Sequence, residues 1–346
     1  MQTTEIIRCT EATYQEFAIK VFTHLGVPAE TASLAVRSLL DASLLGVDTH
    51  GVESLKMYVD HLVEGGLKAT EKPMMMRGVG NLEQWDMRSG FGLASARIIM
   101  EHAVSQARLN GIHMATVRRS NHIGACGIYG KIAADAGLIG MVSQQTGPAF
   151  APWGGEEAKI GASPFAFVAP VEGMFPFYFD CSMAAVTRSQ IRSYRSLGNP
   201  LPEGIAMDAR GRPTTDPEEA WFGQLRPIGR YKGVGFAMVF EVLSAIASGN
   251  QFANGIPSIV DEPDKSADSG VFLIAINPEA VFPDGRFAER MREYIEYVES
   301  SAAKDPNDPP HYPGRREGER WEDRRTNGIP ISELGWKNFD LIADRL

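Results

Sequence analysis

Cysteine is scarce in this sequence of 346 residues, and its three cysteines lie far apart. Cys9, Cys126 and Cys181 are odd in number and form no CxxC pair, which argues against a disulfide framework and against a cysteine-based zinc site. No apolar run approaches the roughly 18 residues that a membrane-spanning helix needs. The first residues carry charges where a signal peptide would be apolar, so we expect a cytoplasmic protein without a membrane partner.

Positive charge is also in short supply, because 43 acidic residues outnumber 34 lysines and arginines and leave a net charge of -9. A nucleic-acid surface needs clustered positive charge. The basic residues are scattered except in GRREGERWEDRR (314–325), where acidic residues interrupt them. We interpret this late patch as a solvated face and expect no nucleic-acid partner.

Two common catalytic and nucleotide-binding signatures are missing. No GxSxG motif occurs, and Cys181 follows an apolar run where a thiol is usually inert, so nucleophilic catalysis has little support. The segment GVGFAM (233–238) lacks the third glycine of a dinucleotide fingerprint and follows no obvious strand. We therefore predict no Rossmann motif.

Glycine, in contrast, is abundant, and it is densest between residues 118 and 170. Glycine lets the backbone approach a ligand closely, so loops of this composition suit contact with a cofactor. The runs MATV (114–117) and LIGMVS (138–143) predict strands, and a helix is expected between them at about 127–136. This predicted strand–loop–helix–strand unit is the centre of the chain.

The remaining elements follow from apolar spacing and from capping residues. Expected helices cover 11–26, 30–46, the segment after Gly51, the segment that ends at Gly111, 187–198, 286–304 and 332–346; one more is entered through a glycine-rich loop at 226–235. Expected strands cover 175–180 and 270–276. We predict irregular structure for 71–92, a turn-rich surface segment for 199–220 and a charged loop for 304–320.

His50 is a candidate acid or base. It lies in the glycine-bounded hexapeptide GVDTHG (46–51), directly after Asp48 and Thr49. Histidine is the usual proton-transfer group near neutral pH, and a neighbouring oxygen fixes its tautomer. The structural alternative is a histidine that caps or packs at a helix start.

Three other polar residues are candidates with their own structural alternatives. His122 lies in the glycine loop SNHIGA. Asp180 ends an apolar strand, where a carboxylate needs a partner or a ligand, and a helix cap would serve equally. Lys232 stands at a helix start, a suitable place to meet an anion, and a solvated lysine is the alternative.

Several motifs occur together in a recognisable order. They are GVDTHG with Tyr58 downstream, SNHIGACGIYGKIA (120–133), APWGG (151–155), GASPFAFVAP (161–170), PTTDP (213–217), KGVGF (232–236), YPGRREGER (312–320) and NGIPI (327–331). With this combination the chain resembles the type-2 malate/L-lactate dehydrogenases over nearly its whole length. That family includes ureidoglycolate and sulfolactate dehydrogenases, diketogulonate reductase and piperideine-carboxylate reductases.

The resemblance implies an α/β fold of mixed α+β character that is not Rossmann. A central mixed sheet would be flanked by helical N- and C-terminal parts, with a helical part at 1–75, a cofactor domain at 76–280 and a C-terminal part at 281–346 that packs back on the first. It also implies a homodimer in which NAD or NADP exchanges a hydride with a small 2-oxo or 2-hydroxy acid, a ketone or a cyclic imine.

The resemblance also implies roles for individual residues. His50 would be the acid or base, supported by Thr49, with His122 and Asp180 as further catalytic residues. Substrate contacts would come from Ser54, Lys56, Tyr58 and Arg188. Cofactor contacts would come from His122, Ile123, Gly124, Ala125, Cys126, Ser163, Asp180, Cys181, Ser182, Lys232, Gly233, Pro313, Gly314 and Arg315. We expect no metal site.

The sequence departs from the family pattern at expected substrate and cofactor contacts. Ser54 occupies the position of a family arginine that binds the substrate carboxylate, and a hydroxyl cannot replace that bidentate pair. GASP stands where the family has GTNP, and DCSMA (180–184) where it has DxATS. These changes leave two alternatives to a redox enzyme: a lyase or hydrolase that uses His50 and His122, or a non-catalytic homologue.

Overall fold

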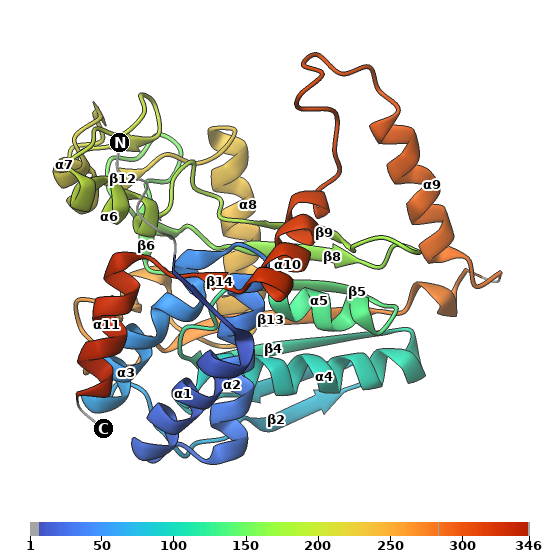
Figure 1. Ribbon diagram of the computed structural model, residues 1–346, viewed down its shortest axis with the longest axis horizontal. Helices are drawn as coiled ribbons and strands as arrows, with labels where there is room; N and C mark the ends of the chain where they lie inside the picture. Colours follow the sequence, from blue (N-terminus) through green and yellow to red (C-terminus); the bar gives the residue numbers. More distant parts are fainter. Residues whose placement is uncertain (1–6, 283, 345–346) are drawn as a thin grey trace.

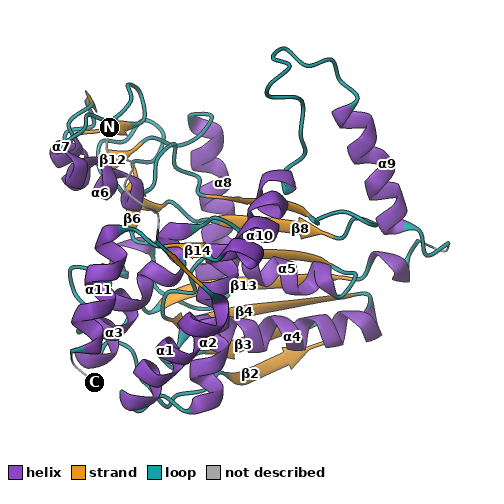
Figure 2. Ribbon diagram, viewed as in Figure 1, coloured by secondary structure: helices purple, strands orange, loops and turns teal. Residues whose placement is uncertain are grey.

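The computed structural model describes residues 7–282 and 284–344, without the side chain of Ser189. Its centre is a seven-stranded mixed sheet (Figures 1 and 2). In sheet order the strands are β2 (Met74–Val79), β3 (Leu82–Asp86), β4 (Ile112–Ser120), β13 (Ser269–Ile276), β5 (Ile139–Gln144), β8 (Phe165–Ala169) and β9 (Phe177–Cys181). Only the pair β3–β4 is parallel among these neighbours. This arrangement confirms the predicted α/β fold with a central mixed sheet.

Helices cover both faces of the sheet. On one face lie α4 (Gly92–Asn110) and α5 (Gly127–Asp135), and behind the sheet in Figure 1 lies α8 (Tyr231–Glu241), which continues into a π-helical turn, Val242–Ile246. Strand β13 contributes side chains to the apolar cores on both faces of the sheet, because successive side chains of a strand point to opposite faces. Val271 and Leu273 join the apolar cluster under α4 and α5, whereas Phe272 joins the cluster with Phe240 of α8.

The two ends of the chain meet in a third apolar cluster. Helices α1 (Glu11–His24), α2 (Ala29–Leu44) and α3 (Leu55–Val63) come from the N-terminal part, and α10 (Arg315–Asn327) and α11 (Glu333–Ala343) come from the C-terminal part. Phe22 and Leu39 share this cluster with Phe339 and Ile342. Strand β1 (Arg8–Cys9) pairs with β14 (Ile329–Pro330) and closes the contact. The exact domain boundaries remain a prediction.

Smaller elements extend from two corners of this body (Figure 1). One group, at the upper left of the view, consists of β6 (Pro148–Phe150), β7 (Ile160–Gly161), α6 (Arg188–Leu197), β10 (Ala206–Met207), β11 (Pro213–Thr214), α7 (Pro217–Phe222) and β12 (Gln224–Leu225). At the right, α9 (Phe287–Glu299) projects from the sheet end. Within the described residues, no helix is long and apolar enough to span a membrane.

Most expected elements are confirmed, including the helices of the central unit, the strand at 270–276 and the last helix. Four expectations were wrong in detail. Residues 71–92 contain β2 and β3, because an exposed edge strand need not show apolar alternation. The charged segment after Gly314 is the helix α10. Lys232 and Gly233 lie in the first turn of α8 and not in a loop, and 199–220 includes the short strands β10 and β11.

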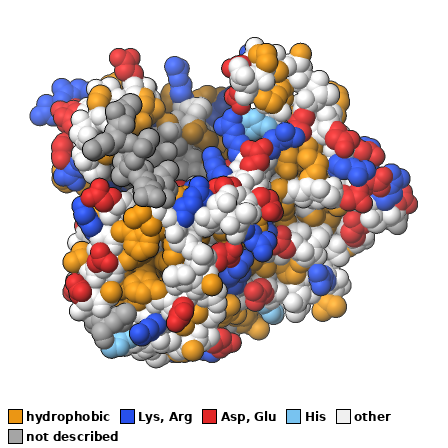
Figure 3. Space-filling model, viewed as in Figure 1, with side chains coloured by type: hydrophobic (Ala, Val, Ile, Leu, Met, Phe, Trp, Pro, Cys, Tyr) orange, Lys and Arg blue, Asp and Glu red, His pale blue; other side chains and the backbone are white. Residues whose placement is uncertain are grey.

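Charged side chains are paired over much of the surface. On the face shown in Figure 3, basic and acidic groups are intermixed, most densely at the right-hand end over the start of α9, where Arg286 pairs with Glu289 and Arg290 with Glu293. The arginines of α10 also have carboxylate partners: Arg315 with Glu299, Arg316 with Asp308, Arg320 with Glu317, Arg324 with Asp48, and Arg325 with Glu11. The patch is therefore neutralised within the chain.

Candidate active site

The hexapeptide GVDTHG forms a tight turn between α2 and α3. Its Asp48–His50 segment is a 3-10 turn. A Cβ on Gly51 would lie 2.0 Å from Oγ of Ser43, so the glycine permits this close approach. Asp48 is held from the other end of the chain, because Arg324 of α10 donates to both of its carboxylate oxygens at 2.5 and 3.0 Å. The turn is thus fixed from two sides.

His50 is oriented by its own neighbour. Oγ1 of Thr49 lies 2.9 Å from Nδ1 of His50, which leaves Nε2 to face a substrate. The backbone carbonyl of Thr49 accepts a hydrogen bond from Oγ of Ser54 at 3.0 Å. Ser54 therefore braces the turn in this structure. This contact is a structural role for the residue that stands where the family has arginine.

His122 lies against His50 although 72 residues separate them in the sequence. The two rings stack with centroids 5.4 Å apart and planes 25° apart. The hydroxyl of Tyr58, a buried residue of α3, lies 2.8 Å from Nδ1 of His122. A Cβ on Gly124 would lie 3.9 Å from the carbonyl of His50, so the glycine loop passes directly beside the pair. The structure brings together His50, Thr49, His122 and Tyr58.

Both imidazoles are held neutral. Burial lowers the pKa of His50 to about 4, and the positive charge of Arg192 adds to this effect. Burial also lowers the pKa of His122 to about 3, with a further contribution from His50. Paired titratable groups with strongly shifted pKa values in one place are typical of functional sites. At neutral pH both rings are therefore uncharged.

The loop that carries His122 is fixed on both sides of the histidine. The side chain of Gln144, at the end of β5, donates to the carbonyl of Asn121 at 3.0 Å and accepts from the amide of Ile123 at 3.1 Å. The amide group of Asn121 donates to the carbonyl of Ser89 at 2.8 Å. The carbonyl of Ile123 also accepts the hydroxyl of Tyr129 at 2.5 Å. These bonds leave the His122 loop little freedom.

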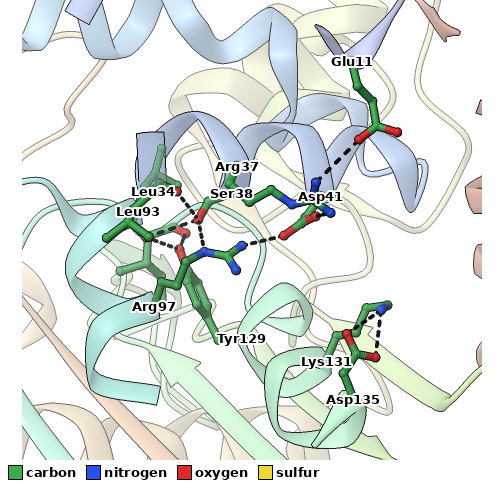
Figure 4. A network of polar contacts seen from close by, with 11 residues as sticks. Glu11, Leu34, Arg37, Ser38, Asp41, Leu93, Arg97, Tyr129, Lys131 and Asp135 are labelled. Atoms are coloured by element: carbon green, nitrogen blue, oxygen red, sulfur yellow. Dashed lines mark hydrogen bonds and ion pairs between the residues drawn. The ribbon is translucent and has the colours of Figure 1, made fainter. Parts of the chain in front are cut away.

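Tyr129 belongs to a polar network buried between α2, α4 and α5 (Figure 4). Arg97 of α4 and Asp41 of α2 form an ion pair at 2.5 Å, and both side chains are about one-tenth exposed at most. Ser38 donates to the carbonyl of Leu93, which Tyr129 also approaches at 3.3 Å. The network therefore connects the helices behind the site with the loop that holds His122.

Asp180 caps α5. Its Oδ2 accepts the backbone N–H of Gly127 at 2.7 Å, so the structural alternative considered from sequence is present. A Cβ on Gly127 would lie 2.0 Å from the hydroxyl of Tyr178, which explains the glycine. Burial raises the pKa of Asp180 to about 6 even though the Gly127 amide opposes this effect. A functional role for Asp180 remains a prediction.

The residues predicted to contact a cofactor come from several segments. Cys126 is buried in the core, whereas Cys181 is partly exposed at the end of β9. Ser163 is fully buried, its φ is +31°, and its hydroxyl has no partner among the described residues. A buried hydroxyl without a partner is unusual and fits a group that a ligand would satisfy. The structure thus offers one polar atom suited to a bound cofactor.

Two other predicted cofactor segments lie at separate places. The carbonyl of Pro313 accepts the N–H of Tyr178 at 2.8 Å, so the segment 313–315 lies beside the start of β9. A Cβ on Gly314 would lie 2.2 Å from the carbonyl of Pro176. Lys232 is exposed in the first turn of α8. Contacts of these residues with a cofactor remain predictions.

Two predicted substrate contacts have charges that are already engaged. Lys56 forms an ion pair with Asp60 at 2.5 Å. Arg188 donates to the carbonyls of Ala220, Trp221 and Gly223, which ties α6 to α7. Arg192, one turn further along α6, is exposed and makes no hydrogen bond or ion pair with residues 7–282 or 284–344. Its positive charge is the one that acts on His50.

Comparison with known proteins identifies the family. The sequence model of the malate/L-lactate dehydrogenases matches residues 9–340. The chain belongs to the malate/L-lactate dehydrogenase family. It is 32% identical to a malate dehydrogenase of Pyrococcus abyssi, over 95% of this chain and 92% of that protein. It is 30% identical to an L-sulfolactate dehydrogenase of Methanothermobacter thermautotrophicus, over 91% and 90% of the two chains.

Solved structures agree with this membership. The malate dehydrogenase of Entamoeba histolytica superposes with a TM-score of 0.92 at 26% identity, covering 99% of this chain and 98% of that one. The Δ1-piperideine-2-carboxylate reductase of Pseudomonas syringae pv. tomato, at 22% identity, shares the fold with a TM-score of 0.88 over 97% and 99% of the two chains. The family resemblance expected from the motifs is therefore confirmed. Membership among these dehydrogenases and reductases supports an oxidoreductase.

Sequence reasoning missed Gln144 and Tyr129, which hold the His122 loop, and Arg192, whose charge lowers the pKa of His50. Gln144 and Tyr129 hold the loop through bonds to distant backbone atoms, which no local pattern reveals. Arg192 lies in the polar segment TRSQIRSYRSLG, where its neighbours Arg188 and Arg195 look equivalent. A polar glutamine at the end of the apolar run LIGMVS was the available signal for Gln144.

Proposed function

We propose that this protein is a NAD(P)-dependent dehydrogenase or reductase of small 2-hydroxy and 2-oxo acids. The observation that carries the proposal is the neutral pair His50 and His122, stacked at 5.4 Å and oriented by Thr49 and Tyr58. A base that is neutral at pH 7 suits removal of a hydroxyl proton. The malate and sulfolactate dehydrogenases among its relatives support acids with a second anionic group as substrates.

The chain's own residues account for the proton. In the oxidative direction His50 takes the hydroxyl proton through Nε2 while Thr49 fixes Nδ1. His122 orients the developing carbonyl oxygen, and Tyr58 holds the His122 ring in place. A bound NAD or NADP would supply the hydride acceptor for the hydroxyl-bearing carbon, so that the alcohol loses a proton from oxygen and a hydride from carbon. Reduction is the reverse, with His50 protonated.

The cofactor contacts are proposed on the sequence match and on the unsatisfied hydroxyl of Ser163. Four arginines are candidates for contact with the 2′-phosphate of NADP: Arg118, Arg119, Arg315 and Arg316. Arg118 and Arg119 pair with Asp86, and the other two pair with acidic residues near α9 and α10. A 2′-phosphate would therefore compete with a carboxylate at each of them. The binding experiment therefore uses both NADH and NADPH.

We also propose that Arg192 holds the substrate carboxylate in place of the arginine that Ser54 replaces. Its guanidinium is not engaged by other described residues, and its charge reaches His50. A guanidinium binds a carboxylate with two parallel hydrogen bonds. Lys56 and Arg188 are less suitable, because each already binds other groups of the chain.

A cytoplasmic homodimer completes the proposal. Edge strand β2 presents apolar side chains to solvent, with Met74, Met75, Met76 and Val79 each 44–66% exposed. Exposed apolar edges of this kind are usually covered by a partner. Size-exclusion chromatography with light scattering would give twice the chain mass for a dimer.

Nucleotide binding is the first experiment. The purified protein is titrated with NADH and with NADPH, followed by fluorescence and by melting temperature, because a ligand in excess stabilises the fold that binds it. Oxidation of the preferred nucleotide is then measured with a panel of 2-oxo acids, ketones and cyclic imines. We expect binding of at least one nucleotide and turnover of a 2-oxo acid.

His50→Gln tests the assignment of the base. This variant keeps a polar side chain of similar size, so it should bind the nucleotide like the wild type while turnover falls by about 100-fold or more. The matched control is His24→Ala, an exposed histidine of α1. Absence of nucleotide binding at millimolar concentration would contradict the redox proposal and favour a reaction that uses the two histidines alone.

A further inference from the structure

A second cluster of titratable side chains lies at the opposite end of β4 from His122. It consists of Glu83 of β3, His113 of β4 and His102 of α4, whose nitrogen and oxygen atoms all lie within 4.8 Å of one another. His113 is seven residues before Ser120, the last residue of β4, which corresponds to roughly 23 Å of extended strand. The group is therefore separate from the His50–His122 pair.

The fold places these three side chains on one side of the sheet. Strands β3 and β4 run parallel, and Glu83 stands beside Ala115. His113 is two residues from Ala115, so both project to the same face, which α4 covers. His102 comes down from the middle of α4. One residue from each of three elements thus meets at a single point.

The contacts within the group are close. Nε2 of His102 lies 3.0 Å from Oε2 of Glu83, and Nε2 of His113 lies 3.3 Å from the same oxygen. The two imidazole rings are nearly perpendicular, with centroids 5.5 Å apart. Metal bonds of about 2.0–2.1 Å at tetrahedral angles put neighbouring ligand atoms about 3.3 Å apart. The two nitrogen-to-oxygen separations are within a few tenths of an ångström of that value, and all three ligand atoms lie within 4.8 Å of one another.

His113 gives the group an unsatisfied ligand. Only 1% of this residue is exposed, and neither ring nitrogen has a hydrogen-bond partner among the described residues. The approach of its Nε2 to Glu83 lacks the alignment of a hydrogen bond. Buried polar atoms in proteins almost always have partners. A metal ion bound between Nε2 and the carboxylate would provide the missing partner.

We propose that Glu83, His102 and His113 bind a divalent transition-metal ion, with Zn²⁺ as the best match. Two imidazoles and one carboxylate are a common ligand set for zinc, and a water molecule would take the fourth position. The side chain of His102 is 32% exposed, so the open position faces an entry path from solvent. Nε1 of Trp85 donates to Oε2 of Glu83 at 2.8 Å and orients the carboxylate from outside the ligand set.

The distance from His50 indicates a structural role. A bound ion would connect β3, β4 and α4 at the end of the sheet remote from the candidate active site. The proposal does not depend on the redox function, because none of its three ligands belongs to the His50–His122 site. It predicts that zinc stabilises the fold whether or not a nucleotide binds.

The test is metal binding by the purified full chain. After removal of metal with a chelator, the protein is titrated with ZnCl₂ by calorimetry, and the melting temperature is measured with and without zinc. We expect one ion per chain and a higher melting temperature in its presence. Cobalt in place of zinc should produce the visible absorption of a tetrahedral site with nitrogen and oxygen ligands.

Variants assign the binding to these residues. His102→Ala changes a partly exposed ligand and should fold, and Glu83→Gln keeps the shape of the carboxylate; each should weaken binding by about tenfold or more. His24→Ala, on the surface of α1, is the matched control, and His50→Gln shows whether the other histidine pair competes for zinc. Failure of the wild type to bind zinc, or unchanged binding in both ligand variants, would overturn the proposal.

Discussion

At the residue scale, the candidate site contains two histidines whose surroundings disfavour the protonated form. His50 and His122 lie side by side, each partly buried, and the charge of a protonated His50 would lower the pKa of His122. The exposed guanidinium of Arg192 lowers the pKa of His50 further. An anionic substrate bound near Arg192 would screen this charge. Substrate binding and the basicity of His50 are therefore linked through one arginine.

Arg192→Ala tests that link. The variant should raise KM for a 2-hydroxy acid by about tenfold or more, since a charge-assisted hydrogen bond contributes about 1.5–3 kcal/mol. It should also raise the pKa of His50, so the loss of oxidative kcat/KM on acidification should begin at a higher pH than in the wild type. The pH profile of kcat/KM measures both effects.

The control is Arg195→Ala on the same helix. Arg195 pairs with Glu218 at 2.5 Å, and it is not among the causes of the shifted His50 pKa. Its replacement should leave KM and the pH profile unchanged. An Arg192→Ala enzyme with the wild-type profile and KM would show that the carboxylate contact comes from elsewhere.

At the scale of elements, the site depends on a loop that the strands and helices around it hold in place. Gln144 reaches from the end of β5 and bonds to the backbone on both sides of His122. It also donates to Oγ of Ser269 on β13 at 2.8 Å. One side chain thus joins two strands to the catalytic loop. Its removal should affect the position of His122 more than the rest of the fold.

Gln144→Leu is the corresponding prediction. The change leaves the carbonyl of Asn121 and the amide of Ile123 without this partner, which should cost about 1–3 kcal/mol of unfolding free energy. We expect kcat to fall at least tenfold in a protein that still folds. Gln84→Leu is the comparison: Gln84 bonds to the carbonyl of Ser248 from β3 and contacts no part of the His122 loop. Equal losses of kcat in the two variants would refute a positioning role for Gln144.

The elements also show what the sequence can predict. The amphipathic helices and apolar strands were predictable, because their spacing is a local signal. Strand β2 was missed because all six of its residues are exposed. Helix α10 was missed because its sequence is mostly charged and Gly318 is its only buried residue, so it lacks an apolar helical pattern. The insertion of β13 between β4 and β5 joins residues far apart in the chain, which local reasoning cannot predict.

The same limit applies to the site. His50 and His122 could be predicted because glycine motifs surround each of them, and the family match placed both near a substrate. Their stacking, the shifted pKa values and the partners Gln144 and Tyr129 depend on the folded environment. The missing arginine at Ser54 was visible in the sequence. Its proposed replacement on α6 was not, because only the fold brings Arg192 near His50.

At the scale of the whole molecule, the lowered pKa values of His50 and His122 make stability depend on pH. The folded state holds His50 at a pKa of about 4 and His122 at about 3, below the 6.5 of a free histidine. Between these values the unfolded chain binds more protons than the folded one, so stability falls as the pH decreases from about 6.5. Asp180 acts in the opposite sense, since its raised pKa of about 6 favours the folded state on acidification. Because two histidines oppose one carboxyl group, these three residues together lower the free energy of unfolding as the pH decreases.

Comparison of the wild type with His50→Gln isolates one part of this dependence. Groups other than His50 and its neighbour His122 titrate alike in both proteins, so the difference between their unfolding free energies reports on this pair. We expect the wild type to lose more stability than the variant between pH 7 and pH 5, as measured by denaturant unfolding at several pH values. The replacement also removes one cause of the lowered pKa of His122, the charge of a protonated His50. Both histidines are uncharged near pH 7, so the two proteins should differ in the pH dependence of their stability only at acid pH. Parallel stability curves for the two proteins would mean that His50 has an ordinary pKa in the folded state, and the neutral base on which the proposed reaction depends would have to be reconsidered.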